Sequence, residues 1–225
     1  MIKDRRFALA FRAASMLFAL VNLLSAMGVL KGKMYQGILM YYTMQSNILV
    51  ILLFGALAVR TGIDLRKERI GSAGYFARFE MVCVIDILLT FVVYWTLLAP
   101  GYSAADGEYS LWSFDNLAVH GITPLLCLLD YAMFSQPRHL KYRDIYCVLI
   151  FPFAYVAATS LAGLLGYSYM VSPADGKPVR FPYFFFDFDR IGLMSLIYIG
   201  VLVAFFLIIA HFFYLIDKKI RKIKL

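Results

Sequence analysis

The sequence predicts an all-α polytopic membrane protein, a single bundle of six transmembrane helices, and two observations carry this prediction. The 225 residues are 62% hydrophobic and only 16% charged, a composition that ordinary soluble domains do not have. Several apolar stretches also reach the roughly twenty residues that a helix needs to cross the hydrocarbon core of a bilayer. The predicted spans cover residues 7–30, 36–59, 79–99, 111–134, 145–165 and 191–216. Because only short connections remain, residues 1–225 are expected to form one domain.

The basic residues lie in alternate connections, and this pattern predicts how the spans are oriented. They gather at the N-terminus, in the second and fourth loops and in the C-terminal tail, whereas the other three loops carry few of them. The positive-inside rule therefore places the N- and C-termini in the cytoplasm. The net charge of +8 is interpreted as this orientation signal and as contact with membrane lipids, with no nucleic-acid partner.

The first span, 7–30, follows three basic residues and resembles a signal peptide in that respect. Its apolar run is longer than the core of a signal peptide and further spans follow, so we expect a retained membrane anchor. Arg12 lies near the inner end of this span. A long basic side chain at such a place is expected to extend to the membrane surface.

The second span, 36–59, carries three polar residues on one face. Spacings of three and four residues bring Thr43, Ser46 and Asn47 together, and polar residues on one face of a membrane helix point into the bundle. Thr43 lies about seven residues below the outer end, near 10 Å at about 1.5 Å per residue. The structural alternative is a hydrogen bond from its hydroxyl to the carbonyl of Leu39, four residues earlier.

The third span, 79–99, contains Asp86, for which structural pairing is the favoured role. Trp95 lies at the outer end of this span, and Trp112 lies at the outer end of the next one. Together with several tyrosines, including Tyr94, these tryptophans are typical of the aromatic belt at a membrane interface.

The fourth span, 111–134, contains His120, an ionisable side chain about nine residues below the outer surface, near 13 Å. Ionisable groups at such depth usually face a protein interior and carry function. Asn116 lies one turn above on the same face, and Asp115 is its neighbour. Pro124 has no N–H to give to the carbonyl of His120, so we expect a bend there and a substitute donor from elsewhere. Asp130, nearer the inner end, is expected to be paired structurally.

The last loop, between the fifth span, 145–165, and the sixth, 191–216, ends in an aromatic segment from Phe181 to Asp189. It is too apolar to be fully solvated, and it is expected to fold back over the outer mouth of the bundle. The three histidines lie at different depths and cannot supply a three-histidine zinc site. We therefore expect no metal and no other cofactor.

A hydroxyl and an imidazole at matched depth suit acyl transfer. Threonine is a weak nucleophile unless a base removes its proton during attack, and neutral imidazole is such a base. Thr43 and His120 are therefore the candidate catalytic pair. The residues alone leave two other classes open, a non-catalytic lipid-binding protein and a small-solute transporter.

Three segments carry a family resemblance: Tyr42–Asn47, His120–Asp130 and the aromatic stretch Phe181–Asp187. On these segments the chain resembles a bacterial member of the six-helix androgen-induced-protein family, whose animal members are intramembrane threonine hydrolases. The resemblance implies a hydrolase in a bacterial plasma membrane that cleaves lipid esters, of the type in which a fatty acid is esterified to a hydroxy fatty acid. It also implies that Thr43 is the nucleophile and His120 the general base.

Supporting groups are expected around this pair. Ser46, Asn47 and Asn116 are the candidate donors to the oxyanion. Asp115, Asn116 and Asp187 are the candidates for orienting the imidazole.

Overall fold

The computed structural model describes residues 2–223 apart from 72, 104–109, 135–139 and 173–174. Within these residues six helices are long and apolar enough to cross a membrane, which confirms the predicted fold class. The spans are Arg5–Ala26, Tyr42–Arg66, Ala77–Gly101, Phe114–Phe134, Tyr142–Leu164 and Met194–Lys219.

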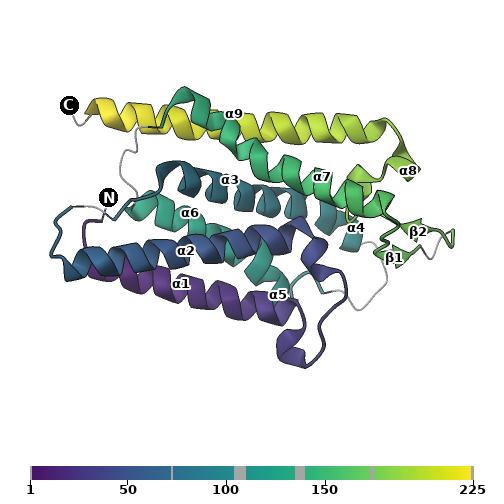
Figure 1. Cartoon of the computed structure of the whole chain (residues 1–225), viewed down its shortest axis with the longest axis horizontal. Helices are drawn as coiled ribbons and strands as arrows, with labels where there is room; N and C mark the ends of the chain where they lie inside the picture. Colours follow the sequence, from purple (N-terminus) through teal and green to yellow (C-terminus); the bar gives the residue numbers. More distant parts are fainter. Residues whose placement is uncertain (1, 72, 104–109, 135–139, 173–174, 224–225) are drawn as a thin grey trace.

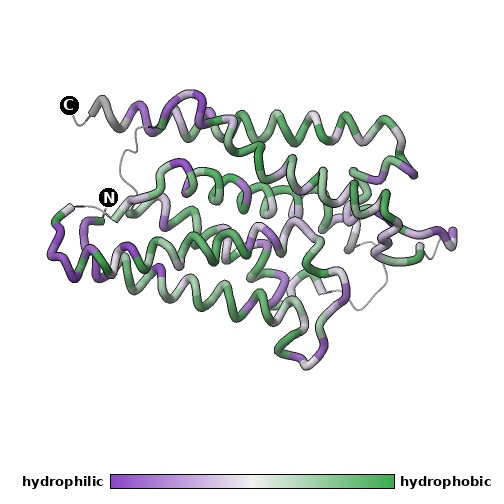
Figure 2. Tube along the Cα trace, viewed as in Figure 1, coloured by the Kyte–Doolittle hydropathy of each residue, from purple (hydrophilic) through white to green (hydrophobic). Residues whose placement is uncertain are grey.

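The helices run side by side along the long axis of the molecule, and both termini lie at the same end (Figure 1). Helices α1 and α2 form a hairpin, and α3 lies at the centre, where it packs against α2, α6 and α9. Hydrophilic segments gather at the two ends of the bundle, with apolar stretches between them (Figure 2). The α-helices are α1 (Arg5–Ala26), α2 (Tyr42–Arg66), α3 (Ala77–Val93), α4 (Ala99–Ser103), α5 (Phe114–Leu117), α6 (Thr123–Phe134), α7 (Ile150–Leu164), α8 (Phe188–Ile191) and α9 (Met194–Ile223).

Shorter elements interrupt or connect these helices. The 3-10 helices are η1 (Val29–Lys31), η2 (Ile38–Met40), η5 (Tyr142–Leu149) and η6 (Phe184–Phe186). The π-helical turns are η3 (Tyr94–Leu98) and η4 (Ala118–Ile122). One antiparallel hairpin joins β1 (Met170–Val171) to β2 (Pro178–Val179).

The second span begins six residues later than the hydropathy pattern predicts, at Tyr42 instead of residue 36. Gly37 adopts a left-handed conformation with a φ of +73°, so no α-helix can run through it, and the 3-10 turn Ile38–Met40 follows. Tyr41 is then extended, and α2 starts after it. Thr43 therefore lies in the first turn of a helix, not about seven residues into one.

The third and fourth spans each contain a π-helical turn. η3 separates α3 from α4, and η4 separates α5 from α6. Pro124 lies in the first turn of α6, directly after η4. The departure from regular α-helix at the proline therefore takes the form of a π-helical turn, which is wider than an α-helical one. Single π-turns of this kind are frequent at functional sites.

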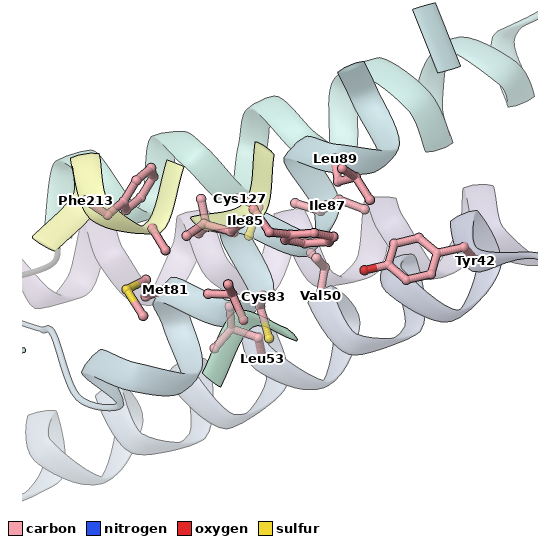
Figure 3. Close-up of a cluster of buried hydrophobic side chains, with 14 of the residues drawn as sticks. Tyr42, Val50, Leu53, Met81, Cys83, Ile85, Ile87, Leu89, Cys127 and Phe213 are labelled. Carbon is pink, nitrogen blue, oxygen red and sulfur yellow. The ribbon is translucent and has the colours of Figure 1, made fainter. Parts of the chain in front are cut away.

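The apolar core follows α3 through the bundle. Figure 3 shows Met81, Cys83, Ile85 and Ile87 of α3 among side chains from three other helices. The neighbours that it labels from those helices are Tyr42, Val50 and Leu53 of α2, Cys127 of α6 and Phe213 of α9. In lipid, close packing of this kind holds helices together in place of the hydrophobic effect.

Arg12 does not reach the membrane surface, so that expectation is wrong. Its side chain is fully buried, and its guanidinium donates to both carboxylate oxygens of Asp130 at 2.7 and 3.1 Å. It also donates to the hydroxyl of Thr61 and the carbonyl of Ala73, each at 2.8 Å. A bidentate carboxylate with two further acceptors satisfies the guanidinium inside the bundle, and the pairing expected of Asp130 is confirmed.

The aromatic end of the last loop folds back over the bundle, as its composition predicts. Tyr183, Phe185 and Phe186 are all buried. The ring of Tyr183 meets that of Tyr41, just before α2, edge to face at 5.9 Å between centroids. The loop therefore covers the end of the bundle at which α2 begins.

Candidate functional site

The structure brings Thr43 and His120 together, as their similar depth predicts. The Oγ1 atom of Thr43 lies 3.3 Å from Nε2 of His120, and both side chains are buried, with 7% and 8% of their surface exposed. Thr43 comes from the first turn of α2, and His120 from the π-helical turn η4. A hydroxyl and an imidazole nitrogen thus meet across two spans.

The surroundings of His120 determine which of its nitrogens carries the proton. Its Nδ1 atom lies 3.2 Å from the carbonyl oxygen of Asn116. Because a carbonyl only accepts hydrogen bonds, Nδ1 is assigned as the donor, and the lone pair of Nε2 faces the hydroxyl of Thr43. The ring of Tyr94 stacks on the imidazole, with 3.7 Å between centroids and 17° between planes. The ring is therefore fixed in position and in tautomer.

The donor that replaces the missing N–H of Pro124 is the indole of Trp95. Its Nε1 atom donates to the carbonyl of His120 at 3.1 Å. Trp95 and Tyr94 therefore hold the histidine and are not simply belt residues, and Tyr94 is only 2% exposed. The sequence carried one signal for this role, since the proline required a donor from another helix. It did not say which one.

Asn47 ties the two halves of the site together. Its side-chain amide donates to the carbonyl of Thr43 at 2.8 Å and to that of Val119 at 3.1 Å. The amide therefore links the first turn of α2 to η4, and both of its donor positions are occupied by backbone carbonyls. Asn47 is placed to hold Thr43 and His120 at a constant separation.

The other two expected oxyanion donors are also engaged within the protein. The hydroxyl of Ser46 lies 3.0 Å from the carbonyl of Thr43 and 2.9 Å from the hydroxyl of Thr90. The side-chain amide of Asn116 donates to the hydroxyl of Tyr94 and to the carbonyl of Leu111, at 2.5 and 2.7 Å. These contacts make Ser46 and Asn116 supports for the site in this structure.

Neither aspartate expected to orient the imidazole contacts it. Asp115 accepts hydrogen bonds from Ser25 at 2.6 Å and from Lys31 at 2.7 Å. The hydrogen bond and the charge of Asp115 raise the pKa of Lys31. Asp187 caps α8 instead, accepting the backbone N–H of Arg190 and pairing with its guanidinium at 3.1 Å. The orienting group is the backbone carbonyl of Asn116.

Two cavities meet at Thr43. The first, here called the apolar chamber, lies among α2, α3, α7, α9 and the aromatic loop, and Val93, Phe153, Leu202 and Phe206 are among its lining residues. The second, here called the polar vestibule, differs in that many polar side chains line it. The polar side chains along it include Lys31, Ser110, Ser113, Asp115, Asn116 and His120.

Of the residues that the structure describes, four line both cavities, namely Thr43, Tyr94, Leu98 and Tyr183. Thr43 therefore lines both an apolar space and a space along which several polar side chains lie. A molecule with an apolar chain and a polar end can occupy both spaces with its junction at Thr43. His120 lines only the vestibule, on the polar side of that junction.

The described residues contain no group of three His, Cys, Asp or Glu side chains suited to a metal ion. His211 packs against the rings of Tyr142 and Tyr214, away from the site. The third histidine, His139, lies outside the described residues.

No protein-family model, no curated protein and no solved structure matches this chain. The resemblance to the androgen-induced-protein family therefore stays a prediction.

Proposed function

We propose that the protein is an intramembrane hydrolase of lipid esters, with Thr43 as the nucleophile and His120 as the general base. The observation that carries the proposal is the 3.3 Å approach of Thr43 Oγ1 to His120 Nε2, at the boundary of the two cavities. Hydroxyl, base and orienting carbonyl then follow the arrangement of hydrolases that use an activated alcohol.

In the first step Oγ1 of Thr43 attacks the ester carbonyl while Nε2 of His120 takes the hydroxyl proton. Collapse of the tetrahedral intermediate breaks the bond to the leaving alcohol, which receives that proton from Nε2. Water then attacks the acyl-threonine, again losing a proton to His120, and the acid is released as Oγ1 regains its hydrogen. The contact between Nδ1 and the Asn116 carbonyl stabilises the imidazolium that forms in each step.

The start of α2 supplies donors for the oxyanion. The first N–H groups of a helix have no acceptor within it, and the helix dipole adds positive potential there. The capping residue Tyr41 makes no side-chain cap, and its carbonyl accepts the N–H groups of Met44 and Gln45. The N–H groups of Tyr42 and Thr43 itself are the ones we assign to the developing oxyanion.

The two cavities indicate how a lipid ester binds. The acyl chain occupies the apolar chamber, and the polar part of the substrate, with the hydrolytic water, occupies the vestibule. Phe153 of α7 lines the chamber and is 51% exposed on the outside of the bundle. A lipid can therefore enter sideways from the bilayer between α7 and α9. A fatty acid esterified to a hydroxy fatty acid, as the resemblance implies, has the required shape.

Labelling by a fluorophosphonate probe tests the nucleophile and the base. The probe phosphonylates an activated hydroxyl with loss of fluoride, so Thr43→Ala should abolish labelling, and His120→Ala should slow it by about 100-fold or more. Thr159→Ala removes a buried hydroxyl of α7 that donates to the carbonyls of Tyr155 and Val156 in its own helix. This control should label as the parent does.

Ser46→Ala addresses the rival hydroxyl one turn below Thr43 and should retain labelling. Loss of labelling in Ser46→Ala with full labelling of Thr43→Ala would mean that the nucleophile is Ser46. Lipid extracts incubated with the parent protein and with Thr43→Ala, compared by mass spectrometry, should then show an ester consumed only by the parent. Lipid bound but never cleaved would indicate a lipid-binding protein, and solute flux in proteoliposomes without hydrolysis would indicate a transporter.

A further inference from the structure

A second apolar space lies toward the opposite end of the bundle from Thr43. This groove runs between the start of α3 and the start of α7, and α2 contributes Leu49 to it. Its cavity volume is about 680 Å³, far more than a single water occupies, and it is open along one side. Its apolar lining includes Phe76, Phe79, Val82, Ile150 and Phe151.

Two cations stand at the end of this groove where α3 and η5 begin. Arg78 is in the first turn of α3, and Lys141 immediately precedes η5. The carboxylate of Asp144 is engaged on both oxygens, because Oδ1 pairs with Arg78 at 2.9 Å and Oδ2 accepts the backbone N–H of Lys141 at 2.9 Å. The carboxylate thus fixes the guanidinium of Arg78 beside the groove, and one net positive charge remains.

We propose that this groove binds an anionic phospholipid. Its phosphate accepts hydrogen bonds from the guanidinium of Arg78 and the ammonium of Lys141, while an acyl chain lies along Phe79 and Val82 toward Phe151. An apolar channel with a cationic mouth matches the shape and the charge of such a lipid. A zwitterionic lipid binds less strongly, because its own ammonium group is repelled by the positive charge of the site.

Fluorescence quenching by brominated lipids tests this assignment. Phe79→Trp places an indole in the groove, and the native Trp95 and Trp112 lie at the other end of the third and fourth spans, so the parent protein gives the background. The protein is reconstituted in phosphatidylcholine vesicles that contain a fixed share of either phosphatidylglycerol or phosphatidylcholine brominated in its acyl chains. The phosphatidylglycerol should bind roughly fivefold more strongly at the new indole.

Substitutions at the mouth separate the proposed site from general attraction to a basic surface. Arg78→Gln with Lys141→Gln leaves the carboxylate of Asp144 as the one charge of these three side chains and should abolish the preference for phosphatidylglycerol. Lys141→Gln alone leaves the pair of Arg78 with Asp144 intact and should lower the preference part of the way. Arg66→Gln with Lys67→Gln removes the same charge at the end of α2, outside the groove, and should preserve the preference.

Three results would overturn the proposal. One is equal quenching by both lipids in the parent carrying Phe79→Trp. Another is the same loss of preference in the Arg66 and Lys67 control, which would mean a diffuse charge effect. The third is an indole that neither lipid quenches in a protein that sediments as a dimer, which would mean that a second copy of the chain covers the groove.

Discussion

Two residues from different spans act on one backbone atom at the site. Pro124 has no N–H to donate to the carbonyl of His120, and the indole N–H of Trp95 donates to it instead at 3.1 Å. The carbonyl belongs to the residue whose imidazole faces Thr43, so its hydrogen bond also determines where the ring stands. A buried carbonyl left without a donor costs about 1–3 kcal/mol.

A double-mutant cycle tests this shared role. Trp95→Phe removes the indole donor and should destabilise the protein by about 1–3 kcal/mol and slow fluorophosphonate labelling of Thr43. Pro124→Ala restores an N–H beside the carbonyl, so Trp95→Phe should cost less in that background by about 1 kcal/mol. Thermal unfolding in detergent measures the cycle. Strictly additive effects would contradict the shared role.

At the scale of the element, the turn before α2 decides where Thr43 lies. Gly37 has a φ of +73°, and a Cβ there would come within 2.5 Å of the hydroxyl of Tyr167. The hydroxyl of Tyr155 on α7 donates to the carbonyl of Met40 at 2.9 Å and holds the same turn from the other side. The start of α2, and with it the N–H groups assigned to the oxyanion, depends on this turn.

Gly37→Ala should therefore destabilise the protein and misplace Thr43. The left-handed conformation alone costs a residue with a Cβ about 1–2 kcal/mol, and the contact with Tyr167 adds to this. The matched control is Gly62→Ala within α2, where a Cβ meets nothing within 4 Å. That substitution should stabilise by about 0.5–1 kcal/mol. Thermal unfolding midpoints measure the stability of the two variants, and fluorophosphonate labelling measures the reactivity of Thr43. Equal labelling of the two variants would mean that the turn at Gly37 does not position Thr43.

At the scale of the whole molecule, six spans return both termini to one end of the bundle. The site lies toward the opposite end, where α2 begins, and the groove with Arg78 and Lys141 lies at the end that carries the termini. The distribution of basic residues predicts that the termini lie in the cytoplasm and the site in the outer leaflet.

Cysteine accessibility in bacterial cells that express the protein tests this orientation. In a Cys147→Ala background the two remaining cysteines, Cys83 and Cys127, are buried and should not react. Lys33→Cys should react with a membrane-impermeant maleimide in intact cells, whereas Lys67→Cys should react only after the cells are opened. The reverse pattern would place the proposed active site in the cytoplasmic leaflet.

The sequence by itself determined the class of the molecule and the neighbourhood of the site. Span number follows from length and hydropathy, because a bilayer demands about twenty apolar residues per helix whatever the bundle packs against. The pairing of Asp130 and the approach of Thr43 to His120 were also predictable, since polar groups at membrane depth must meet one another.

Only the tertiary structure decided which groups serve which role. The π-helical turns, the indole donor of Trp95, the stacking of Tyr94 and the commitment of Asn47 to two carbonyls all depend on the rotation and register of one span against another. A hydropathy pattern describes one span at a time and contains no such information. The observed start of α2 differs from the predicted one for the same reason, because Tyr155 from a distant helix stabilises the turn that follows Gly37.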